Sequence, residues 1–123
     1  PIGPKGDPGT ARAYGLVQYG DCVANTTCTF SRAKNIVAVR RVGTGIYCIT
    51  AASPINPATD LLMAGVEYKQ TVAPQGNASA LPAGTYTTGG CDPATEFKLV
   101  TQRSTDTTTA SPASNISFWF AIP

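Results

Sequence analysis

The chain contains no histidine, and charged residues occupy only 13% of its 123 positions. Without an imidazole there is no Ser-His-Asp triad, no Cys-His pair and no histidine ligand for a metal. The seven Asp and Glu residues form no motif that implies a paired general acid and base, although glycosidase carboxylates can lie far apart in sequence. Phosphate-binding loops and EF-hand loops are also missing. We therefore expect a protein that is not an enzyme and that needs no cofactor and no metal.

Long apolar runs and a strong net charge are absent too. No stretch approaches the 18 apolar residues that a transmembrane helix needs, so we expect no membrane insertion. The formal charge of +2 is too small to favour nucleic acid as a partner. Apolar residues make up 42% of the chain, which is enough for one modest hydrophobic core.

The N-terminal stretch, Pro-Ile-Gly-Pro-Lys-Gly-Asp-Pro-Gly, places a glycine at every third position. Gly3, Gly6 and Gly9 keep this period, with prolines between them. A collagen triple helix requires a residue without a side chain at each third position, because only glycine fits at its axis. A Pro/Gly-rich linker that matches the period by chance is the alternative. The period stops at Thr10, which divides the chain into the end of a collagen-like segment (1–10) and a β domain (11–123).

The cysteines are even in number and indicate an oxidising compartment, because the chain is small, poor in charge and rich in Thr, Ser, Gly and Pro. The four are Cys22, Cys28, Cys48 and Cys91. Three pairings are possible, and we favour Cys22–Cys28, across a short polar loop, with Cys48–Cys91. A zinc site is the competing interpretation, but no C-x-x-C spacing supports it.

From residue 12 onward, short β-rich runs alternate with turn residues, a pattern typical of an all-β sandwich or barrel. We expect strands at 12–19, from Phe30, at 35–42, at 46–50, at 96–102 and at the C-terminus. The strand at 35–42 is apolar on both faces, so we expect it to be covered on both sides. Residues 61–68 are either a strand, which we favour, or the end of a helix that Asn56 would cap. Residues 73–93 and 105–114 are expected to be loops.

The last strand has the most regular alternation. Ile116, Phe118, Phe120 and Ile122 share one face, which we expect to point inward. That leaves Trp119, the only tryptophan, on the opposite face, either packed under a loop of its own chain or in contact with another subunit. Candidate residues of a trimer interface are Trp119, Tyr14, Val37 and Val39.

Four of the nine basic residues fall within ten positions: Arg32, Lys34, Arg40 and Arg41. Such a cluster is a candidate patch for an acidic glycan or another surface anion. The alternative is a solvated edge strand whose charges prevent aggregation.

The Gly-X-Y run resembles the collagen-like repeats of animals, bacteria and phages. Residues 40–49 (Arg-Arg-Val-Gly-Thr-Gly-Ile-Tyr-Cys-Ile) and 118–123 (Phe-Trp-Phe-Ala-Ile-Pro) resemble a small C-terminal β domain of bacterial secreted collagen-like proteins. The arrangement is similar to the C1q and TNF-like group, whose C-terminal jelly rolls trimerise on collagen-like stalks. The aromatic motifs of C1q domains are not visible here, so only the architecture carries over.

Together these features predict an antiparallel β-sandwich or jelly-roll-like domain that forms a homotrimer behind a short collagen-like segment. The expected function is structural: the domain aligns three chains and nucleates or caps a triple helix in a secreted or cell-surface protein. The alternative is a head at the tip of a stalk or fibre that binds a host surface or a glycan.

Overall fold

The computed structural model describes residues 11–22, 27–67, 69, 71, 76–81, 90–104, 110–112 and 115–123. The Gly-X-Y segment predicted at 1–10 and the loop at 105–109 lie outside these residues. The described part contains nine strands and no helix: β1 (Ala13–Val17), β2 (Ser31–Lys34), β3 (Ile36–Gly43), β4 (Ile46–Ala51), β5 (Met63–Val66), β6 (Gly76–Leu81), β7 (Phe97–Ser104), β8 (Ala110–Pro112) and β9 (Phe118–Ile122).

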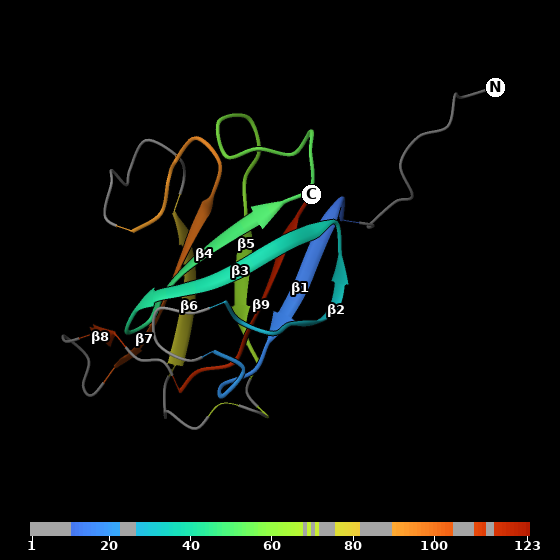
Figure 1. The fold of residues 1–123 in the computed structure, drawn as a ribbon. Helices are drawn as coiled ribbons and strands as arrows, with labels where there is room; N and C mark the ends of the chain where they lie inside the picture. The colour runs from blue at the N-terminus through green and yellow to red at the C-terminus, as the bar shows by residue number, and fades with distance from the viewer. Residues whose placement is uncertain are drawn as a thin grey trace.

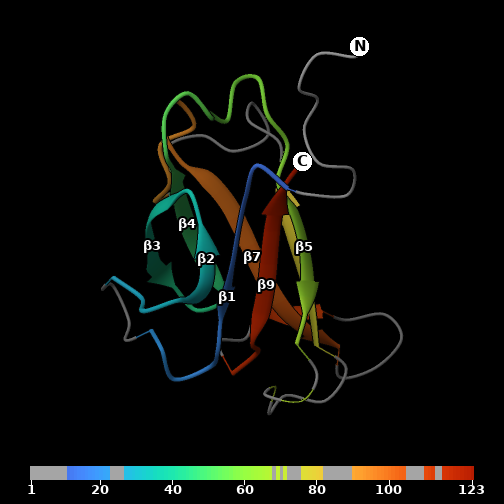
Figure 2. The ribbon, with the colours of Figure 1, turned by 90° about the vertical axis from the view of Figure 1, so that its right-hand side faces the viewer.

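The strands form two antiparallel sheets that pack as a β-sandwich, as the sequence predicted (Figure 1). One sheet has the order β2-β1-β9-β5, and we call it the front sheet. The other has the order β3-β4-β7-β6, with the short β8 paired to the end of β7. Figure 2 looks onto the front sheet, where β1, β9 and β5 run side by side.

The chain passes from the front sheet to the back sheet between β2 and β3, through the single residue Asn35. Its φ of 55° lies in the left-handed region, which asparagine tolerates better than most residues. β3 and β4, which match the strands expected at 35–42 and 46–50, then form a hairpin whose turn ends at Gly45 with a φ of 69°. This connection makes β2 and β3 the edge strands of the two sheets.

The core lies between the sheets and is dominated by the last strand. Phe118, Phe120 and Ile122 are buried in this core, which confirms the predicted inward face of β9. Ile116, just before β9, is buried as well, in a small separate cluster with Val66. The Phe118 ring packs against Tyr47 of the back sheet, with 4.6 Å between ring centroids. Both predicted disulfides, Cys22–Cys28 and Cys48–Cys91, are also present.

Three local predictions were wrong. β3 is not covered on both sides, because it is an edge strand and the Val37 side chain is 64% exposed. β6 lies in a region expected to be loop, since β7 pairs with it along six residues. β8 is a short strand within the second expected loop. The strand alternative for residues 61–68 was correct, and β5 forms there.

Candidate functional site

The start of the β domain is fastened to its neighbours at residues 11 and 12, which we call the junction. The backbone N–H of Arg12 donates a hydrogen bond of 2.8 Å to the carbonyl of Ile122. The Arg12 carbonyl in turn accepts one of 2.8 Å from the Asn35 side-chain amide. The Lys34 ammonium donates to the Ala11 carbonyl over 3.3 Å. The backbone of the junction is therefore fixed by β9 on one side and by the β2–β3 corner on the other.

The Arg12 side chain adds a second set of contacts. Its Nε donates to the Pro123 carbonyl over 2.6 Å, and its Nη2 forms an ion pair with the Asp60 carboxylate. This bond from Arg12, together with a backbone hydrogen bond from Asn56, holds the pKa of Asp60 below its ordinary value. Residues 11 and 12 thus meet the C-terminal strand at one end of the sandwich (Figure 2).

The outer face of the front sheet is apolar. Two cross-strand rows build it: Tyr14, Ala121 and Met63 form one, and Leu16, Trp119 and Gly65 form the other. The large side chains of these rows remain accessible: Trp119 is 42% exposed, Tyr14 40% and Met63 49%. We call Tyr14, Leu16, Met63, Trp119 and Ala121 the apolar face.

Trp119 lies across Gly65 on the neighbouring strand. A Cβ atom at Gly65 would be 2.3 Å from Cζ2 of the indole, so any other residue there would displace the ring. Glycine at this position lets the indole rest against β5 instead of standing away from the sheet. Trp119 is therefore held on the outer surface by its own sheet, and it does not pack under a loop among the described residues.

A groove of about 340 Å³ runs over this surface. Tyr14, Leu16 and Trp119 supply apolar walls, and two charged side chains join them, Arg32 and Glu67. Arg32 belongs to β2, whereas Glu67 directly follows β5, so the two charges come from opposite edges of the front sheet.

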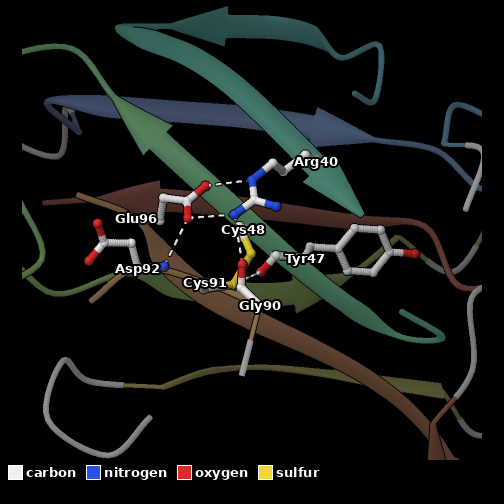
Figure 3. The surroundings of a disulfide bond; sticks show 7 residues. All are labelled: Arg40, Tyr47, Cys48, Gly90, Cys91, Asp92 and Glu96. Atoms are coloured by element: carbon white, nitrogen blue, oxygen red, sulfur yellow. Dashed lines mark hydrogen bonds and ion pairs between the residues drawn. A yellow bond between two sulfur atoms is a disulfide. The ribbon is translucent and has the colours of Figure 1, made fainter. Parts of the chain in front are cut away.

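The outer face of the back sheet is different, because a segment of the chain, residues 90–96, lies against it (Figure 3). The Cys48–Cys91 disulfide attaches this segment to β4. Arg40 on β3 makes a two-pronged contact with Glu96, with Nε and Nη2 at 2.8 and 2.7 Å from the two carboxylate oxygens. Nη2 also donates to the Gly90 carbonyl over 2.6 Å.

These contacts set the protonation of the pair. The hydrogen bond from Arg40 is the largest influence on Glu96 and lowers its pKa, against partial burial, which acts in the opposite direction. The backbone N–H of Asp92 donates to the same carboxylate over 2.9 Å and adds to the lowering. The same bond to Glu96 raises the pKa of Arg40. Arg40 and Glu96 thus form an ion pair that holds residues 90–96 on the back sheet.

The structure brings only part of the predicted trimer interface together. Trp119 and Tyr14 share the apolar face, whereas Val37 is exposed on β3, in the back sheet. Val39 was wrongly included, because it is completely buried in the core. The apolar run at 36–39 gave no alternation from which the inward residue could be read.

The four predicted basic residues do not form one patch. Arg40 is paired with Glu96, and the Lys34 ammonium contacts the junction. Arg41 donates from Nε to the Gly43 carbonyl over 3.2 Å, and Arg32 lines the groove. All four lie on the edge strands β2 and β3, which fits the alternative interpretation of solvated, charged edges.

Several residues of these sites were not predicted. Gly65 and Glu67 lie beside Trp119, Met63 pairs with Ala121, and Asp60 binds Arg12. A glycine inside an apolar run at 63–66 is the one sequence feature that suggests a close approach of another group. The partners themselves depend on strand order, which local sequence does not encode.

Among the described residues, no group of three or more Cys, Asp or Glu side chains is placed to hold a metal ion. No helix in the described ranges is long and apolar enough to cross a membrane. Comparison with known proteins gives no match, whether to a family model, a curated protein or a solved structure.

Proposed function

We propose that the domain is a trimerisation device, which aligns three chains and nucleates or caps a collagen-like triple helix in a secreted or cell-surface protein. The observation that carries this proposal is the junction. Glycines occupy every third position up to Gly9, and three residues later the backbone of Arg12 is hydrogen-bonded to β9 and to Asn35. A stalk that enters through so short and fixed a connection takes its position directly from the domain.

The physical need for such a device comes from chain entropy. Three free chains must meet in register before any triple helix can grow, and only then does each further triplet add stability. Domains that associate hold the three stalk ends together and raise their effective concentration to about the millimolar range. A junction that is fixed within residues 11 and 12 would preserve most of this gain, because no long linker dilutes it.

The two disulfides support an oxidising location outside the cytosol. Disulfides persist in secreted and surface proteins and are rare in reducing cytosol. A bacterial collagen-like protein of the cell exterior, as the sequence resemblance implies, would meet such conditions.

The test compares the refolding of a long Gly-Pro-Pro stalk with and without residues 11–123 attached. With the domain, refolding should be faster and nearly independent of protein concentration, and a single registered helix should form. Without it, refolding should slow steeply on dilution and yield misaligned helices. Circular dichroism follows the helix, and equal rates for both chains would refute the function.

A control separates a specific effect from mere attachment of a folded protein. A monomeric β-sandwich of similar size replaces residues 11–123 at the C-terminal end of the same stalk. If this unrelated domain accelerates refolding equally, trimerisation is not the function.

A second candidate function is a ligand-binding head, and the groove beside Trp119 is the observation that favours it. Exposed aromatic rings next to one basic and one acidic side chain also suit a glycan. In that case the protein would bind its ligand as a single domain.

A further inference from the structure

We infer that the apolar face of the front sheet is the surface on which a second copy of this chain docks, in a closed ring of three. This inference rests on the proposed function and deepens it, since it names the partner, the face and two charged residues that pair across the contact.

The first argument is the unequal covering of the two outer faces. Residues 90–96 lie on the back sheet and are held there by Cys91 and Glu96. On the front sheet, Tyr14, Met63 and Trp119 are between 40% and 49% exposed. Leu61, two residues before β5 begins, is 65% exposed as well. Contiguous apolar surface with an aromatic centre is typical of the buried middle of an interface.

The second argument is charge complementarity between the two edges of the face. In a ring of three, the contact is heterologous, so the β2 edge of one copy meets the β5 edge of the next. Arg32 lies on the β2 edge, and Glu67 lies just past the β5 edge. Within the described part of the chain neither side chain forms an ion pair. One carboxylate oxygen of Glu67 accepts a hydrogen bond of 2.9 Å from the backbone N–H of Lys69, which leaves its negative charge to pair with a neighbour.

Along the strand direction, Arg32 lies close to the level of Trp119, and Glu67 lies about two residues from that level. Ser31, next to Arg32, pairs with Leu16, which itself faces Trp119. The backbone N–H of Glu67 donates to the carbonyl of Ser117, which lies just before β9 and two residues from Trp119. A closed ring relates its copies by rotation alone, so groups that pair across a contact must lie at nearly the same level along its axis. The side chains of Arg32 and Glu67 are long enough to span the difference in level between them.

The third argument is the direction of the stalk. β1 contributes Tyr14 and Leu16 to the apolar face, and it begins immediately after the junction. Three copies that turn this face toward a common axis place their β1 strands next to that axis and parallel to one another. Their junctions then lie together at one end, where three stalk chains must meet.

Sedimentation equilibrium on the whole chain tests the surface. Trp119→Ala should weaken trimer association by about tenfold or more, as expected for an aromatic residue at an interface centre. Val37→Ala is the matched control, because it also removes an exposed apolar side chain, but from the back sheet. Association that Val37→Ala weakens and Trp119→Ala leaves unchanged would overturn the inference.

Charge reversal tests the pairing. Arg32→Glu and Glu67→Arg should each weaken association, and the double variant should recover most of the loss. Circular dichroism of each variant at low concentration verifies that the single domain still folds. Failure of the double variant to recover, with a folded domain, would refute the Arg32–Glu67 contact.

The single tryptophan provides a direct readout. Dilution below the association range should shift the Trp119 emission to longer wavelength and increase its quenching by acrylamide. A wild-type chain that is monomeric at every concentration would refute the proposed function itself. A trimer whose Trp119 stays as quenchable as in the monomer would refute only the surface. Saturable quenching of Trp119 by added oligosaccharide, in a trimer that Trp119→Ala leaves intact, would identify the face as a ligand site instead.

Discussion

Phe118 packs in the middle of the interior, between Tyr47 of the back sheet and Phe120 of its own strand. The centroid of its ring is 4.6 Å from that of Tyr47 and 6.3 Å from that of Phe120. Its side chain is fully buried in a close-packed interior, so removing the ring would leave an unfilled space among its neighbours.

Replacement of Phe118 by alanine should lower the free energy of unfolding by about 3–5 kcal/mol, because it removes buried apolar surface and leaves a cavity. Denaturant titration measures the change. Val37→Ala, on an exposed position, should stay within about 0.5 kcal/mol of the wild type. A loss of less than about 1 kcal/mol at Phe118 would show that β9 does not carry the core on this face.

At the residue scale, buried side chains could be predicted only where apolar and other residues alternate along a strand. The regular pattern of β9 predicted four buried residues and left Trp119 outside, as the structure shows. In β3, consecutive apolar residues gave no such pattern, and the pairing with β4 shifts register between Ile36 and Ala38. The irregularity changes which side chains point inward, and it depends on the partner strand, so Val39 could not be assigned from sequence.

At the element scale, residues 90–96 are held on the back sheet by a covalent bond and a charged one. The pKa of Glu96 is lower in the folded chain than in the unfolded one, chiefly through the hydrogen bond from Arg40. The resulting stabilisation is complete above the ordinary pKa of the glutamate and disappears as pH falls through the lowered value. Asp60, bonded to Arg12, has a lowered pKa too and acts in the same direction.

The free energy of unfolding should therefore decrease as pH is lowered below about 4.5, the ordinary pKa of glutamate. Glu96→Gln should cost about 1–2 kcal/mol at neutral pH, an estimate reduced because Arg40 is partly exposed. The variant should lose less stability than the wild type between pH 6 and 3. Parallel pH profiles for the two proteins would show that the pair contributes nothing.

Element existence was predicted well where β-branched and aromatic residues were dense, as in β3, β4 and β9. β6 was missed because its sequence, Gly-Asn-Ala-Ser-Ala-Leu, has little intrinsic preference for a strand. It forms since β7 offers a complete row of backbone partners, from Lys98 to Arg103. A strand that forms because a distant strand pairs with it cannot be recognised from its own sequence. The contact between Trp119 and Gly65 depends on strand pairing in the same way.

At the scale of the whole molecule, association and folding should be linked. If three chains fold and assemble together, the melting temperature rises with concentration, because association stabilises only the folded state. For a domain of this size we expect a rise of roughly 5–10 °C over a hundredfold increase in concentration. Calorimetry with reversible rescans measures it. A melting temperature that does not change with concentration would indicate that the chain of 12.7 kDa is stable as a monomer.

The position of β1 also determines how the domain would resist mechanical force. Residue 11 leads into a strand that has neighbours on both sides, β2 and β9. If the proposed stalk pulls along the axis of β1, it loads the five residue pairs from Ala13–Ile122 to Val17–Phe118 together in shear. An edge strand pulled sideways would instead lose its pairs one after another. A stalk under tension would thus be anchored where the sheet yields least readily.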